Sequence, residues 1–163
     1  MPFKPISDYG VIGDMHSAAL VASDGSIDWL CFPRFDSPSV FAAILDDKKG
    51  GTFRVGPVGE YRREHYYLPD SNVLVTNHTT DSGAVSLTDF MPLGDDVTHC
   101  DHELVRILRC QSGRVDMEAL FQPRLDYARN HTEVSVDGRR AVARHGDDCL
   151  SLSAGVTGVS RLP

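Results

Sequence analysis

The chain has 163 residues, of which 41% are hydrophobic and 24% are charged, and its formal net charge is −7. This length suits one domain, which can bury roughly 70% of the surface of its unfolded chain. The negative charge opposes nucleic-acid binding, because such binding depends on Lys and Arg side chains that neutralise phosphates. No apolar run approaches the ~20 residues that cross a bilayer, and the first residues lack the apolar region of a secretory signal. We therefore expect no nucleic-acid partner, no membrane partner and a cytoplasmic location.

The first clear elements are two short apolar runs, residues 18–22 and 27–31. The turn between them contains Asp24 followed by Gly25. An Asp-Gly pair between apolar runs is the strongest local signal for a hairpin, since glycine accepts a positive φ without steric cost. We therefore predict an antiparallel hairpin at this point.

The segment after this hairpin contains Pro33 and Pro38. Two prolines so close together forbid a continuous helix across the segment and argue against a central strand. Ser37 has the properties of a helix N-cap, with Pro38 at the first helical position. We therefore predict one short helix over residues 38–45.

The rest of the chain alternates between short strand-like runs and turn signals. Short strands, without a long segment of 3.6-residue periodicity, predict an all-β fold, namely an antiparallel β-sandwich. We assign residues 1–154 to this domain and residues 155–163 to a tail or a truncated continuation. The further predicted strands cover residues 52–55, 61–68, 72–80, 84–91, 103–111, 115–122, 133–136, 141–144 and 149–153.

Four blocks of sequence resemble a known enzyme family. The first lies within residues 5–38 and contains the runs PISDYGVIGD, AALV, DGSIDWLC and PRFDSP. The others are TDFMP at residues 88–92, LVR at 104–106 and PRLDY at 123–127, in which Leu125 stands where the family usually has Phe. In this order they resemble the bacterial glucoamylase and trehalase-like proteins of glycoside hydrolase family 15, over residues 5–152.

The resemblance implies a β-sandwich, of the supersandwich kind, that precedes a helical-barrel catalytic domain. That barrel is the expected partner of this chain. Enzymes of the family invert an α-glucosidic centre with two glutamates, which stand about 6.5–9.5 Å apart and belong to the barrel. The glutamates of this chain lie in or beside predicted strands, and none matches a catalytic motif; they are Glu60, Glu64, Glu103, Glu118 and Glu133. We therefore assign no catalytic residue and no cofactor, and we expect no activity from this chain alone.

One stretch has more aromatic and charged character than a turn requires. Its candidate residues are Asp28, Trp29, Arg34, Phe35 and Asp36. In the functional interpretation they line the rim of the barrel's active site or dock the sandwich on the barrel, and Arg34 suits sugar contact because its planar fork binds paired hydroxyls or carboxylates. In the structural alternative, Trp29 and Phe35 are core residues and Arg34 pairs with Asp36 or Asp28.

The run from His99 to Glu103 invites a metal interpretation, because Cys100 and two imidazoles lie close together and could bind zinc. Structural zinc requires four ligands, and no second cluster in the sequence has matching spacing. We favour a solvated loop and predict no metal site. The cysteines are scattered without a Cys-x-x-Cys pair, so we also predict no disulfide.

Two functions remain open. The first is a non-catalytic N-terminal domain of a glucoside hydrolase, which packs on the barrel and shapes its entrance. The alternative is a stand-alone carbohydrate-binding or protein-interaction module. A surface that normally covers a barrel exposes apolar groups, so we also expect the isolated domain to form a homodimer, through residues 29–45 or 149–153.

Overall fold

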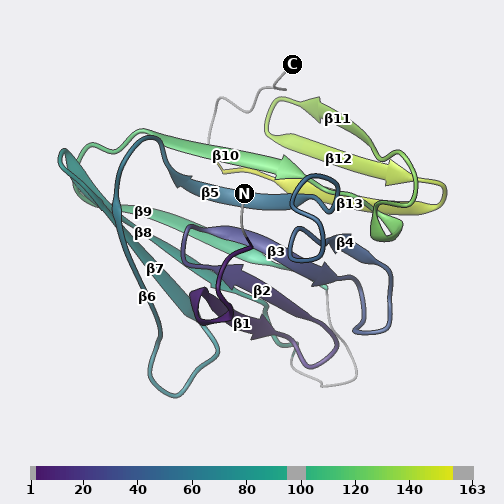
Figure 1. The fold of residues 1–163 in the computed structure, drawn as a ribbon, viewed down its shortest axis with the longest axis horizontal. Helices are drawn as coiled ribbons and strands as arrows, with labels where there is room; N and C mark the ends of the chain where they lie inside the picture. Colours follow the sequence, from purple (N-terminus) through teal and green to yellow (C-terminus); the bar gives the residue numbers. More distant parts are fainter. Residues whose placement is uncertain (1–2, 95–101, 156–163) are drawn as a thin grey trace.

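The computed structural model describes residues 3–94 and 102–155. These residues form strands that lie in three antiparallel sheets, together with two single 3-10 turns, η1 (Ile6–Asp8) and η2 (Asp126–Ala128) (Figure 1). Among the described residues, no helix is long and apolar enough to span a membrane. The all-β antiparallel fold is therefore confirmed, and most of residues 155–163 lie outside the described part of the chain.

The first two sheets are the layers of the sandwich, and the third sheet follows them in the chain. The first sheet has the order β1 (Tyr9–Gly13), β2 (Ala18–Ala22), β3 (Ser26–Cys31), β5 (Thr52–Pro57) and β10 (Met117–Gln122), with β4 (Ser39–Phe41) also paired to β3. The second has the order β6 (Arg62–Tyr67), β7 (Leu74–Thr80), β8 (Gly83–Phe90) and β9 (Val105–Gly113). The third contains β11 (Glu133–Asp137), β12 (Arg140–His145) and β13 (Asp148–Ser153).

The predicted hairpin between residues 18–22 and 27–31 is confirmed as β2 and β3. Gly25 has a φ of 81°, and a Cβ atom there would collide with the carbonyl oxygen of Val55. Glycine is therefore required at this turn both for its conformation and for the close approach of β5. The chain order does not predict that β10 pairs with β5 in the first sheet, leaving β9 in the second.

The predicted helix over residues 38–45 is wrong. Ser39–Phe41 form strand β4, which pairs with β3 and has all three residues buried. The Ser37 hydroxyl accepts a hydrogen bond from the backbone N–H of Arg34 (3.1 Å) and caps no helix. After β4 the chain makes one turn, in which the N–H of Leu45 donates to the carbonyl of Ala42 (2.9 Å). Burial of the β4 side chains against β3 therefore outweighs the local capping signal.

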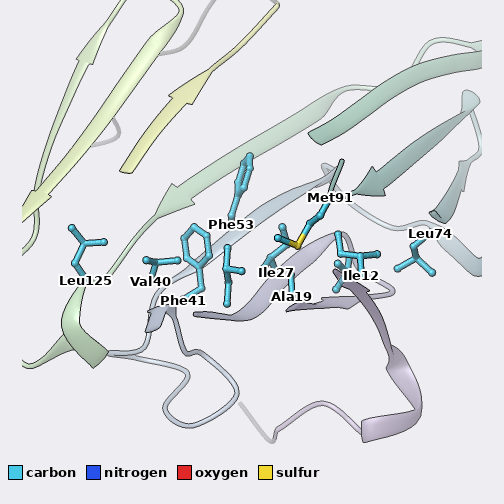
Figure 2. Close-up of a cluster of buried hydrophobic side chains, with 11 residues drawn as sticks. Ile12, Ala19, Ile27, Val40, Phe41, Phe53, Leu74, Met91 and Leu125 are labelled. Atoms are coloured by element: carbon cyan, nitrogen blue, oxygen red, sulfur yellow. The ribbon is translucent and has the colours of Figure 1, made fainter. Parts of the chain in front are cut away.

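The core is one continuous layer of apolar side chains that runs from Leu125 to Leu74 (Figure 2). Its aromatic part is a triad in which Phe53 and Phe121 lie 5.4 Å apart, with Phe41 6.3 Å from Phe53 and 6.1 Å from Phe121. Leu150 and Leu152 of the third sheet pack against this layer. The third sheet thus shares the core of the sandwich.

A buried arginine joins the two main sheets. The guanidinium of Arg106, on β9, binds both carboxylate oxygens of Asp89, on β8, at 2.8 and 3.1 Å. It also donates to the backbone carbonyls of Phe53 and Gly25 in the first sheet, both at 2.7 Å. The Arg106 side chain is 5% exposed and that of Asp89 is 0% exposed, and the guanidinium carbon lies 4.8 Å from the centre of the Phe53 ring.

We expect Arg106→Met to lower the free energy of unfolding by about 3–5 kcal/mol, because it leaves the Asp89 carboxylate buried without its partner. Urea denaturation measures this change. Arg114→Met is the matched control, since the Arg114–Asp116 pair is 89% and 80% exposed and such surface pairs contribute at most about 1 kcal/mol. Equal effects of the two substitutions would contradict the role given to Arg106.

Candidate functional site

Four segments converge where β1 and β3 end, on the side of the molecule that carries β4 (Figure 1). The backbone N–H of Phe35 donates to the carbonyl of His16 (2.8 Å), in the turn that follows β1. The rings of His16 and His102 lie 6.0 Å apart, and the ring of Phe32 lies 6.2 Å from that of His102. We call this surface, made of residues 14–17, 32–38, 102–104 and 124–129, the loop face.

The fourth segment joins the loop face through Tyr127. Its hydroxyl donates to the carbonyl of Ser37 (3.4 Å), and the guanidinium of Arg129 lies 5.1 Å from the centre of its ring. Leu125, 3% exposed, anchors this segment in the core, and its N–H donates to the hydroxyl of Thr132 (2.9 Å). The anchor holds an exposed aromatic ring and an exposed guanidinium beside residues 32–38.

Three of the predicted site residues meet on the loop face. Phe35 is 61% exposed, which excludes the alternative that places it in the core. Arg34 and Asp36 form an ion pair with 3.2 Å between Nε and Oδ1, with side chains 69% and 77% exposed. Both keep polar atoms open to solvent, so this segment presents one aromatic ring between a donor and an acceptor.

The backbone of the loop face adopts unusual conformations. Of six non-glycine residues with positive φ in the described part of the chain, five lie here: Met15 (73°), His102 (50°), Asp126 (52°), Tyr127 (55°) and Ala128 (56°). Such conformations each cost about 1–3 kcal/mol and concentrate at functional sites, where the surrounding structure enforces them. Their gathering marks this end of the sandwich as the best candidate surface for recognition.

The structure places Asp28 away from the loop face, in a polar cluster that holds the N-terminal segment. Lys4 donates to Asp28 (2.7 Å) and pairs with Asp24 (2.9 Å). The hydroxyls of Tyr9 (2.9 Å) and Thr52 (2.8 Å) also donate to the Asp28 carboxylate, which is 4% exposed. All the strong partners of this carboxylate are thus within the fold, and its role there is structural.

The ionisation of this cluster follows from its surroundings. Burial, and then the hydrogen bond to Asp28, raises the pKa of Tyr9 well above its ordinary value. Burial alone would favour the neutral form of Asp24, but the hydrogen bond and charge of Lys4, with hydrogen bonds from Ser26, lower the pKa of this carboxyl. The Asp24 carboxyl is therefore ionised at neutral pH.

Trp29 lies in a third environment. It stands opposite Leu20, which stands opposite Val11, so the three form one row across β3, β2 and β1. Val11 is 50% exposed, and Leu20 and Trp29 are partly buried. The row is an apolar strip on the face of the first sheet that turns away from the second.

The predicted metal-ligand run lies partly outside the described residues, which do not include positions 99–101. His102 contacts His16 and Phe32 in the loop face. Among the described residues, no group of three or more His, Cys, Asp or Glu side chains is arranged to hold a metal ion. Sequence reasoning missed the contributions of His16, Tyr127 and Arg129, because they join the site through contacts between distant segments.

This geometry defines an antiparallel β-sandwich with exposed aromatic and charged side chains gathered at one end. The chain matches the family described as "Trehalase-like, N-terminal" over residues 3–159. It is 40% identical over 144 residues to a trehalase of Mycolicibacterium smegmatis, an alignment that covers 78% of this chain and 21% of the relative. It is 34% identical over 155 residues to a trehalase of Thermoplasma volcanium, covering 93% of this chain and 25% of the relative.

The chain belongs to the family of trehalase-like N-terminal domains. It spans about a fifth to a quarter of the length of these curated relatives. No solved structure matches it at a significant level. The sequence-based recognition is therefore confirmed at the level of the N-terminal domain.

We expect Lys4→Met to lower the free energy of unfolding at pH 7 by roughly 1–3 kcal/mol, since hydrogen bonds to charged groups have this magnitude. Because the folded-state pKa of Asp24 is depressed, the stability it contributes is present above its unfolded pKa of ~4 and is lost as pH falls through the folded value. The difference between wild type and variant should therefore shrink below pH ~4.

Denaturation curves at pH 7, 5 and 3 measure this difference. The control is Lys48→Met, at an exposed lysine in the loop after β4. A difference for Lys4→Met that stays constant over the whole pH range would contradict the ion pair.

Proposed function

We propose that this chain is the non-catalytic N-terminal domain of a cytoplasmic α-glucoside hydrolase of the family 15 type, and that it packs on a separate helical-barrel catalytic domain. The observation that supports the proposal is that most of this chain aligns with only a small part of each relative. Most of this chain aligns with proteins named trehalase, yet the aligned part is 21% of the Mycolicibacterium smegmatis protein. Most of such a protein, with ample length for a catalytic domain, lies outside the matched segment.

The non-catalytic role is supported by the carboxylates of the chain. An inverting hydrolase needs a general acid and a general base facing each other across a substrate site, about 6.5–9.5 Å apart. All five glutamates are exposed on separate strands or loops. Glu118 is engaged with Arg54 at 3.3 Å. Nothing in this arrangement favours acid–base chemistry by these groups.

The packing role is supported by the loop face. Exposed aromatic rings and arginines are the residues that dominate buried interfaces, because they contribute a large contact area and several donors. Phe35 is held by the contact of its backbone with His16, and Tyr127 by its contact with Ser37. A segment that is already held in place before binding loses little conformational entropy when it docks. We therefore assign docking on the catalytic domain to Phe35 and Tyr127.

Within this proposal, Arg34 and Asp36 form part of the rim around the entrance of the catalytic domain. Their exposed ion pair offers guanidinium donors and carboxylate acceptors to sugar hydroxyls. The apolar row that contains Trp29 is a second area of contact for the catalytic domain. Asp28 has no contact role in this proposal, because its hydrogen bond to Lys4 holds the N-terminal segment on the first sheet.

We expect the isolated chain to release no glucose from trehalose or maltose, because it lacks the acid–base pair. A coupled glucose assay on repurified protein measures this directly. Turnover that disappears on replacing a residue of this chain would contradict the non-catalytic assignment.

We expect Phe35→Ser to leave the melting temperature of the isolated chain nearly unchanged, since Phe35 is 61% exposed. In a joined protein, in which this chain replaces the matched segment of the Mycolicibacterium smegmatis trehalase, the same substitution should lower the temperature of thermal inactivation. The control is Val58→Ser, at an equally exposed apolar residue (61%) that directly follows β5 and lies outside the loop face.

If Phe35→Ser and Val58→Ser affect the joined protein equally, docking by the loop face is excluded. Sedimentation of the isolated chain at several concentrations shows whether the loop face forms a homodimer instead of docking on a catalytic domain. In that case Phe35→Ser would weaken self-association, and it would leave the joined protein unaffected.

A further inference from the structure

Four buried polar atoms lie between the two main sheets without a hydrogen-bond partner in the described part of the chain. They are Ser23 Oγ, His65 Nδ1, Thr76 Oγ1 and His78 Nδ1. Thr76 and His78 are 0% exposed and Ser23 is 8% exposed. Native proteins rarely leave such atoms unsatisfied, and ordered water is their usual partner where protein groups do not reach.

The four atoms border one region of the interior. Thr76 and His78 are two positions apart on β7, so their side chains point to the same face of the second sheet. His65 on β6 is the register partner of Thr76. The other ring nitrogen of His78, Nε2, lies 3.4 Å from the carbonyl oxygen of Ser23, in the turn between β2 and β3. The region is thus bounded by β6 and β7 on one side and by this turn on the other.

The chemistry of the region suits water better than an ion. Burial lowers the pKa of both His65 and His78, so both rings are neutral at pH 7 and each has one donor and one acceptor nitrogen. The charged groups acting on His78 are Arg54 and Arg63, opposed by Asp24. Two positive charges disfavour a bound cation, while the Asp24 carboxylate, and the lack of any charged group among the four atoms, disfavour an anion.

We propose that ordered water occupies this region and bridges Thr76 and His78 of the second sheet to Ser23 of the first. Water is both donor and acceptor, so it satisfies two hydroxyls and two imidazole nitrogens whatever their tautomers. The water would bind the β2–β3 turn, to which Arg106 also donates a hydrogen bond at the carbonyl of Gly25 (2.7 Å). The β2–β3 turn is therefore joined to the second sheet by a guanidinium, by the direct contact of His78 with the Ser23 carbonyl, and by water.

The test is Thr76→Val, which removes the hydroxyl and keeps the shape of the side chain. If Thr76 binds water, its loss leaves the water short of a partner, and the melting temperature falls by about 2–4 °C. If the region is dry, the substitution removes an unsatisfied buried hydroxyl, and the melting temperature rises. Thr79→Val, at an exposed position of the same strand, is the matched control and should change it little.

A crystal structure of the wild-type chain at high resolution gives the second readout. The proposal expects an ordered solvent peak within hydrogen-bonding distance of both Thr76 Oγ1 and His78 Nδ1. A rise in melting temperature on Thr76→Val, or a high-resolution map without such a peak, would overturn it.

Discussion

The Arg106 guanidinium contacts both main sheets and sets how they pack on each other. A guanidinium has donors enough for a carboxylate and two carbonyls at once, and all three are engaged at 2.7–3.1 Å. The Asp89 carboxylate belongs to β8, the Gly25 carbonyl to the turn between β2 and β3, and the Phe53 carbonyl to β5. The interaction therefore fixes how the two sheets pack on each other. Such a buried charge tolerates little displacement, since losing any partner leaves polar groups unsatisfied.

The loop face, the candidate recognition surface, depends on this fixed packing of the two sheets. The loop face is assembled from segments that leave different strands, and only fixed strands bring His16, Phe35 and Tyr127 together. Its strained backbone is maintained by buried neighbours such as Leu125, which is 3% exposed. The polar cluster around Asp28 fastens the N-terminal segment to the first sheet in the same way. A sandwich that presents pre-arranged aromatic and charged groups is consistent with the proposal that this chain docks on a catalytic domain.

Sequence reasoning predicted the elements whose signals are local. The β2–β3 hairpin followed from two short apolar runs and from the Asp24–Gly25 pair between them, where the φ of Gly25, 81°, needs glycine. It did not predict β1, where Gly10 interrupts the apolar pattern. A Cβ at Gly10 would lie 2.7 Å from the Leu74 side chain, so this glycine serves the close packing of the two sheets. The helix expected over residues 38–45 failed because pairing of β4 with β3 is a long-range interaction.

The candidate site was predicted in part, for the same reason. Arg34, Phe35 and Asp36 are adjacent in sequence, and their unusual composition identified them. The burial of Asp28 depends on Lys4, which lies 24 positions away, and no spacing rule places those residues together. Tyr127 belongs to a block that resembles the family, yet its contact with Ser37 across 90 positions is visible only in the fold.

Hydrogen–deuterium exchange reports whether the remainder of a trehalase-length protein covers the loop face, as we propose. Exchange would be followed in the isolated chain and in the joined protein under the same conditions. We expect slower exchange in the joined protein for peptides covering residues 32–38 and 124–129, with little change for the loop after β5. Unchanged exchange at the loop face, with new protection elsewhere on the sandwich, would contradict it.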